Sequence, residues 1–350
     1  MNILLIILVF GVIVFFHEFG HFIVAKLNHV AVTEFSIGLG PAIFSIQRKE
    51  TKYSLRLLPL GGYCMMLGAD EDSDDENAFN NKPVWVRILV IAAGPAFNFL
   101  LAFILGIVLI HFAGCDPGRL DEIADNGAAK EAGLSVGDTI KAINGKKIYN
   151  FRELQLFLDL DKKGEAFDLT LERPDGSTYT AHITPKRNQN GEYKIGVTSY
   201  NVEAKGIGQT LKYAALEIRY WTRATITSLR LIVTRKVDSS EIMGPVGVGD
   251  AMNEIIDEVK EESETTKEAV LTILLNLMNW CILLSVNLGI MNLIPIPALD
   301  GGRLLFLIIE AIRRKKISQK KEIIVNVIGF VIVLLLMVVI FFNDIKNIFL

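Results

Sequence analysis

Residues 2–27 read NILLIILVFGVIVFFHEFGHFIVAKL, an apolar run into which His17, Glu18 and His21 intrude near its far end. A helix crosses a bilayer with about 20 mostly apolar residues, so this run is long enough. A secretory signal peptide fits poorly, because no basic segment precedes the run and no small-residue cleavage site follows it. The run therefore predicts a membrane-spanning helix.

Three further segments pass the same test of length and apolar character. The whole chain agrees, since its 350 residues are 51% hydrophobic and 21% charged, with a mean hydropathy of +0.38. This is too apolar for an ordinary soluble protein and too charged to lie in lipid throughout. A net charge of −3 leaves no basic excess for nucleic acid, and three cysteines are too few for a disulfide framework. The three segments are about Ile88–Ala113, Ala269–Leu299 and Ile323–Phe342.

Lysine and arginine in the short loops indicate the orientation. They gather between the first two spans and between the last two, whereas the C-terminal tail has only Lys346. Both basic loops are therefore expected in the cytoplasm. Both termini and the long segment from Cys115 to about Lys267 are expected outside, in a multi-pass protein of the cell membrane.

The long outer segment carries signals of a small β domain followed by a helix. In FDLTLERPDGSTYTAHIT, residues 167–184, two alternating runs are joined by Pro174-Asp175-Gly176, which predicts a hairpin. From Gly206 to Lys236 apolar residues recur at helical spacing. This helix either lies at the membrane surface or packs on the soluble domain.

The first span contains the motif H-E-x-x-H, in His17 to His21. Residues i and i+4 share one face of a helix, so both imidazoles can reach one Zn²⁺, with Glu18 close enough to act on water there. Two partly buried histidines beside a glutamate are the alternative. Ionisable groups at membrane depth are costly unless paired or coordinated, which favours a metal site.

A catalytic zinc site takes three protein ligands and keeps one position open. The second and fourth spans contain no carboxylate, and His111 lies near the outer end of the second. Asp300, in NLIPIPALDGG at the cytoplasmic end of the third span, lies at the depth of the two histidines. Pro295 and Pro297 break the helix there, so Asp300 can turn toward the metal. Taken alone, the segment could also be an ordinary loop exit.

Three motifs in this order resemble the site-2 protease family of intramembrane zinc metalloproteases. They are HEFGH, Gly94-Pro95-Ala-Phe-Asn98-Phe99 and NLIPIPALDGG, and the resemblance covers nearly the whole chain. The bacterial regulator-of-sigma-E protease type, with a PDZ domain between spans two and three, is the most similar type. The resemblance implies Zn²⁺ as cofactor, with His17, His21 and Asp300 as zinc ligands and Glu18 as the catalytic acid/base.

Other residues gain roles only through this resemblance. Asn287 and Asn292 match asparagines that the family uses near the substrate, although hydrogen bonding between helices explains them nearly as well. Asn98 is expected to support the metal ligands, and Gly94 to allow close packing. Residues 45–63 resemble the family's membrane-associated β-hairpin, whose edge can hold an extended substrate segment. An ordinary cytoplasmic hairpin is the alternative.

Residues 128–148, AAKEAGLSVGDTIKAINGKKI, resemble a PDZ domain. The expected fold is an α-helical polytopic membrane protein with four transmembrane helices, a membrane-associated β-hairpin and an inserted extracytoplasmic PDZ domain. The expected division is an N-terminal membrane half, a PDZ domain, a linker with an amphipathic helix and a C-terminal membrane half. These occupy residues 1–114, 115–190, 191–268 and 269–350.

The predicted function is hydrolysis of peptide bonds within or near transmembrane segments, with the active site toward the cytoplasm. The expected partners are the lipid bilayer and single-pass membrane proteins. The resemblance implies anti-sigma factors or signal-peptide remnants as substrates. Two alternatives are a membrane zinc protease of another class and a non-catalytic PDZ membrane scaffold. The scaffold is disfavoured because Glu18, His17 and Asp300 are all present.

Overall fold

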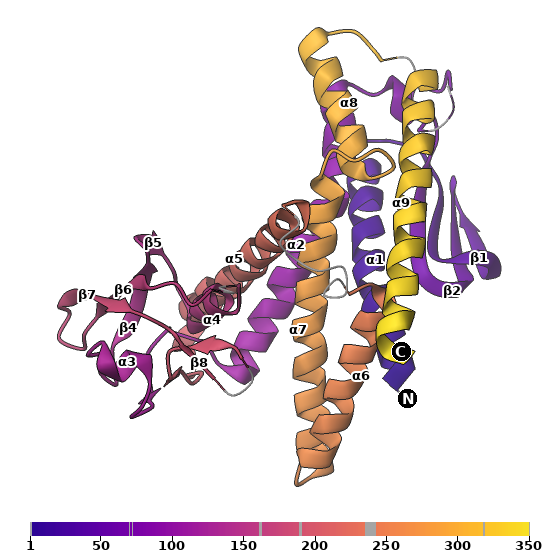
Figure 1. The fold of residues 1–350 in the computed structure, drawn as a ribbon. Helices are drawn as coiled ribbons and strands as arrows, with labels where there is room; N and C mark the ends of the chain where they lie inside the picture. The colour runs from indigo at the N-terminus through magenta and orange to yellow at the C-terminus, as the bar shows by residue number, and fades with distance from the viewer. Residues whose placement is uncertain are drawn as a thin grey trace. The chain divides into compact units, whose positions relative to one another are not determined.

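Four helices among the described residues are long and apolar enough to cross a membrane (Figure 1). The structure is a computed structural model that describes residues 2–69, 71, 73–160, 163–188, 191–234, 243–317 and 319–349. The predicted polytopic helical fold is confirmed. These helices are α1 (Asn2–Leu27), α2 (Val84–Ala113), α7 (Thr266–Leu293) and α9 (Gln319–Phe349).

The third span is shorter than expected. Helix α7 ends at Leu293, not Leu299, and a new helix α8 (Asp300–Arg313) begins after a six-residue loop. Pro295 and Pro297 lie in that loop, where they cannot donate the backbone hydrogen bonds that a continuing helix needs. The break makes Asp300 the first residue of α8.

The chain divides into two compact units, and each is described by itself. One unit contains residues 1–105 and 225–350, and the other contains residues 106–224. The first unit holds the apolar helices together with α6 (Pro245–Glu262) and a 3₁₀ turn at Phe79–Asn81. One core cluster joins α1, α2, α6 and α7 through Val9, Ile13, Leu101, Met252, Ile256, Leu277 and Cys281.

A long hairpin of β1 (Val32–Arg48) and β2 (Thr51–Met66) packs beside α1 (Figure 1). It is longer than the predicted 45–63, because both strands bend and pair twice. Phe35, for example, pairs with Tyr53 on one side and Cys64 on the other. The sheet therefore has four segments, in the order 42–48, 51–58, 32–37 and 62–66. Residues 42–48 and 62–66 form its two edges.

The other unit contains a small antiparallel sheet of order β5-β4-β6-β7. The predicted hairpin at 167–184 is confirmed, with Phe167, Leu169 and Leu171 of β6 buried in the core as the alternation requires. Two short pairs, β3 with β10 and β8 with β9, and the isolated bridges Cys115 with Val202 and Arg119 with Thr139 complete the β structure of this unit among the described residues. The elements are β3 (Glu122–Ile123), α3 (Ala128–Glu131), β4 (Thr139–Ile143), β5 (Lys146–Lys147), α4 (Phe151–Leu160), β6 (Phe167–Glu172), β7 (Thr178–Ile183), β8 (Lys186–Arg187), β9 (Tyr193–Lys194) and β10 (Val197–Thr198).

Helix α5 (Gly206–Val233) packs on the small domain along its first part, as one of the two predicted alternatives states. Glu153 of α4 is buried and forms ion pairs with Arg219 and Arg223 of α5. Arg152 pairs with Glu217 of α5 at 2.7 Å. The predicted helix end at Lys236 lies outside the described residues.

Candidate metal centre

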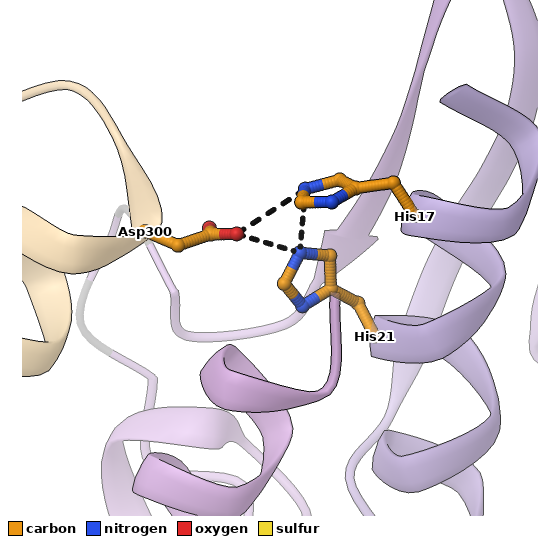
Figure 2. A group of neighbouring side chains, drawn as sticks. All are labelled: His17, His21 and Asp300. Carbon is orange, nitrogen blue, oxygen red and sulfur yellow. Dashed lines mark hydrogen bonds and ion pairs between the residues drawn. The ribbon is translucent and has the colours of Figure 1, made fainter. Parts of the chain in front are cut away.

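Two imidazoles and one carboxylate converge between α1 and α8 (Figure 2). His17 Nε2 and His21 Nε2 lie 3.2 and 3.3 Å from Asp300 Oδ2, and 3.3 Å from one another. Both histidines are buried, with 8% and 6% of their surface exposed. The structure thus brings together the three residues that the sequence predicted as ligands.

The local sequence explains why these side chains meet. His17 and His21 are one helical turn apart, so their rings project from one face of α1. Asp300 enters from the opposite side because the loop after α7 redirects the chain. Gly301 and Gly302 pack directly on that loop, where added Cβ atoms would lie 2.1 Å from the Ile294 oxygen and 2.6 Å from the Ile296 oxygen.

The second nitrogen of each ring contacts α2. His21 Nδ1 lies 2.9 Å from the Val90 carbonyl oxygen. A carbonyl oxygen only accepts, so Nδ1 carries the proton and Nε2 presents its lone pair to the cluster. Hydrogen bonds of this kind orient metal-binding histidines in proteins.

Asn98 supports His17 in the same manner. Its amide nitrogen lies 3.0 Å from His17 Nδ1, and its buried Oδ1 has no hydrogen-bond partner. Turning the amide by 180° lets Oδ1 accept from His17 Nδ1–H, which satisfies the oxygen and frees Nε2. The Ser285 hydroxyl of α7 donates to the Asn98 backbone oxygen at 2.9 Å. Sequence analysis missed Ser285, whose only signal is a hydroxyl within an apolar span.

Gly94 leaves the space in which both rings lie. A Cβ added there would lie 2.3 Å from His21 Nε2 and 2.8 Å from His17 Cε1. On α1, Gly20 directly precedes His21, and a Cβ added at Gly20 would lie 2.4 Å from the Ala93 backbone oxygen of α2. Glycine at both positions lets α1 and α2 approach closely enough to enclose the histidines.

The donor set fits one zinc ion. Ligand atoms about 2.0–2.1 Å from a tetrahedral zinc lie about 3.3 Å from one another. The three pairwise distances in the cluster are 3.2, 3.3 and 3.3 Å. Asp300 Oδ2 is buried without a hydrogen-bond partner. A cation at the centre of the three donor atoms would compensate the buried negative charge. Two imidazoles and a carboxylate are also ligands that zinc prefers.

Glu18 lies between the histidine face of α1 and the edge segment of the sheet. A Cβ added at Gly62 would lie 3.4 Å from Glu18 Cγ, and the Cys64 backbone lies near the Glu18 carboxylate. The edge segment 62–66 therefore runs directly past the cluster. The sequence predicted the hairpin without indicating this contact, which depends on the bend in β2.

The two predicted substrate asparagines lie on different sides of α7. They are five residues apart, which separates them by about 140° around a helix axis. Asn287 hydrogen-bonds Thr225 of α5, whereas Asn292 is buried in the last turn, two residues before the loop that leads to Asp300.

Membrane-compatible helices that enclose an H-E-x-x-H motif and a converging carboxylate define a membrane-embedded metallopeptidase. The sequence profile of Peptidase family M50 matches residues 5–336, so the chain belongs to this family. The predicted resemblance, the peptidase activity and the multi-pass membrane character are confirmed.

Relatives align along nearly their whole length. The regulator of sigma-W protease RasP of Bacillus subtilis is 32% identical, over 98% of this chain and 98% of its own. The zinc metalloprotease RasP of Bacillus licheniformis is also 32% identical with the same coverage. A protein of Clostridium acetobutylicum named as a candidate zinc metalloprotease is 35% identical over 94% of this chain and 92% of its own. The predicted cofactor agrees with the metal in the last two names.

Among solved structures, PDZ domains of SdrC-like proteins from Listeria monocytogenes and Listeria innocua are similar to part of the chain. Each is 20% identical with a TM-score of 0.22 and covers 25% of this chain. The match spans 88% of the first domain and 97% of the second.

Proposed function

We propose that this protein hydrolyses peptide bonds within or near transmembrane segments, with zinc held by His17, His21 and Asp300. The observation that carries the proposal is the triangle of donor atoms, whose sides of 3.2, 3.3 and 3.3 Å match a tetrahedral zinc site. When bound, zinc supplies a Lewis acid that polarises the scissile carbonyl and lowers the pKa of water toward about 7.

The protein's own residues then perform the proton transfers. Glu18 neighbours His17 in the sequence and accepts the proton of the attacking water as a general base. It returns that proton to the leaving amine as a general acid. Val90 and Asn98 hold the two imidazoles in place.

Substrate binding is assigned to the sheet edge beside Glu18. A peptide bond inside a helix is shielded by its own hydrogen bonds, so a transmembrane substrate must unwind before it is cut. The edge segment 62–66 can pair with the extended chain by β-augmentation and place it along the cluster. Asn287 and Asn292 are assigned to substrate contact, with the Asn287–Thr225 hydrogen bond yielding to substrate.

The positions of the basic residues support the proposed orientation, and the name of a relative supports the proposed substrate class. Basic residues gather in the segment between α1 and α2 and in the segment between α7 and α9, which supports a cytoplasmic active site. The small domain is then extracytoplasmic and is assigned as PDZ, in a chain divided at residues 114, 190 and 268. The proposed substrates are single-pass membrane proteins, either anti-sigma factors or signal-peptide remnants, and the relative named regulator of sigma-W protease supports a regulatory target.

The test is cleavage of a tagged single-span substrate in membranes, with zinc content measured on the purified protein. We expect Glu18→Gln to abolish cleavage and keep zinc, because the carboxylate acts on protons and not on the metal. We expect Asp300→Ala to lose both, because two imidazoles alone hold zinc weakly.

The two variants also separate the alternatives. Wild-type cleavage by Glu18→Gln contradicts the protease proposal and favours a scaffold that binds partners through its small domain. Full zinc in Asp300→Ala, with cleavage retained, indicates a protease of another class with a different third ligand. Glu254→Gln, an exposed carboxylate of α6, is the matched control for loss of charge.

A further inference from the structure

The loop between α7 and α8, residues 294–299, has an unusual backbone next to Asp300. Ala298 has φ of +77°, a left-handed conformation that residues with a Cβ rarely adopt and that costs free energy. Asp300 follows two residues later. Whatever stabilises the backbone of Ala298 therefore also determines where the side chain of Asp300 begins.

The first turn of α8 packs tightly against one side of this loop. The loop carbonyls of Ile294 and Ile296 lie directly against Gly301 and Gly302, where added Cβ atoms would approach to 2.1 and 2.6 Å. A shift of the loop would therefore move the start of α8. The direction of the Asp300 side chain is coupled to the loop by this packing.

Helix α9 closes the other side of the loop. The Asn326 side-chain oxygen accepts a hydrogen bond from the Ala298 backbone N–H at 3.3 Å. Three residues later, Gly329 is buried against Pro297, and a Cβ there would lie 2.4 Å from the Pro297 Cβ. Residues three apart share a face of a helix, so one face of α9 carries both contacts.

The position of Asn326 also argues for a specific role. The residues around it on α9 are aliphatic and exposed, with Val327 57% and Ile328 55% exposed, as lipid-facing side chains are. An amide in such a helix is costly unless it is hydrogen-bonded. Its partner is the loop, and Asn326 and Asp300 line the same cavity of about 480 Å³.

We propose that Asn326 is a positioning residue for Asp300. Its hydrogen bond to Ala298, together with the contact of Gly329 with Pro297, holds the loop in the left-handed turn that directs the Asp300 carboxylate at the two imidazoles. The fourth span thereby takes part in building the metal site, although it supplies no ligand. This inference rests on the proposed function, in which Asp300 is a zinc ligand.

The test compares Asn326→Ala with the double variant Asn326→Ala/Ala298→Gly in the full-length protein. Three quantities are measured: kcat and KM for a single-span substrate, the visible spectrum of the cobalt-substituted protein, and the rate of metal loss to a chelator. Asn326→Ala is expected to lower kcat about tenfold, accelerate metal loss about tenfold and alter the cobalt spectrum, with KM within about twofold.

Glycine at residue 298 is expected to restore most of these losses without restoring the hydrogen bond. The reason is that glycine adopts positive φ without a steric penalty, so the loop keeps its shape unaided. Gly329→Ala perturbs the loop without altering Asn326 and is expected to give the same losses. Val331→Ala, at a position 46% exposed on the same helix, is the control and is expected to behave as wild type.

Wild-type kcat and metal retention in Asn326→Ala overturn the inference. So do equal losses in Val331→Ala, or no restoration by Ala298→Gly, because either result indicates a general structural role. The wild type is measured in the same assays, which separates the two proposals. A wild type that neither retains metal nor cleaves contradicts the proposed function, and the inference then fails with it.

Discussion

At Gly94, helix α2 passes so close to the two imidazoles that no side chain fits between them. A Cβ there would lie 2.3 Å from His21 Nε2. The ligand spacing of the H-E-x-x-H motif is set by α1, but the space that the rings occupy is set by a residue on another helix. The motif is therefore necessary for the site and not sufficient for its geometry.

We expect Gly94→Ala to lower zinc affinity by at least about tenfold, because the rings must move apart from Asp300 to admit the methyl group. Zinc content after purification and cleavage of a single-span substrate check this. Gly249→Ala is the matched control, since the nearest side-chain atom to an added Cβ there is 3.9 Å away. Full zinc content in Gly94→Ala would show that the rings do not depend on this space.

At the scale of elements, the end of α9 anchors the start of α6. The buried Asp344 carboxylate accepts hydrogen bonds from the backbone N–H groups of Gly244, Val246 and Gly247 at 2.8, 3.1 and 2.9 Å. These N–H groups have no intrahelical partner, and the helix N-terminus favours a negative charge. Asp344 thereby ties the first residues of α6 to the C-terminal part of α9.

Asp344→Ala is expected to destabilise the protein by about 2 kcal/mol, because it leaves buried N–H groups unpaired. Asp344→Asn keeps one acceptor oxygen and is expected to lose less. Thermal unfolding in detergent measures both, with exposed Glu254→Ala on α6 as the control. Equal midpoints for Asp344→Ala and the wild type would mean that α6 does not need this anchor.

At the scale of the whole molecule, the chain has four candidate membrane spans, and the basic residues between them indicate their orientation. The loop between α8 and α9 contains Arg314, Lys315 and Lys316, whereas the small domain follows the C-terminal end of α2. In the proposed orientation, the start of α8, and with it Asp300, lies toward the cytoplasmic side.

The orientation predicts which introduced cysteines react from outside the cell. In a background without Cys64, Cys115 and Cys281, a membrane-impermeant maleimide should label Ser177→Cys in intact cells. It should label Lys315→Cys only after lysis. Both positions are exposed, so a difference reports the side of the membrane and not burial. Labelling of Lys315→Cys in intact cells would reverse the proposed orientation.

The sequence alone was enough to predict the spans and the three side chains that converge in the candidate metal centre. Whether a segment can span a bilayer depends on its length and apolar character, which are local properties of the sequence. The i, i+4 spacing places both histidines on one face of a helix regardless of the rest of the fold. Asp300 was identifiable because few carboxylates occur at that depth. The proline break after Leu293 was predicted in kind, although the helix ends six residues earlier than expected.

Only the tertiary structure decided how the site is enclosed. The Val90 contact depends on α2 packing on α1, and the Ser285 contact depends on α7 packing on α2. The first involves a backbone carbonyl and the second a single hydroxyl, and neither belongs to a motif. The double pairing of the hairpin depends on bends in both strands, and the alternation of side chains along a strand does not reveal such bends. Asn326 lies in an otherwise aliphatic span, and its partner becomes visible only when α9 packs on the loop before Asp300. Contacts between residues distant in sequence depend on how the helices and strands pack together. The composition and the periodicity of the sequence do not predict these contacts.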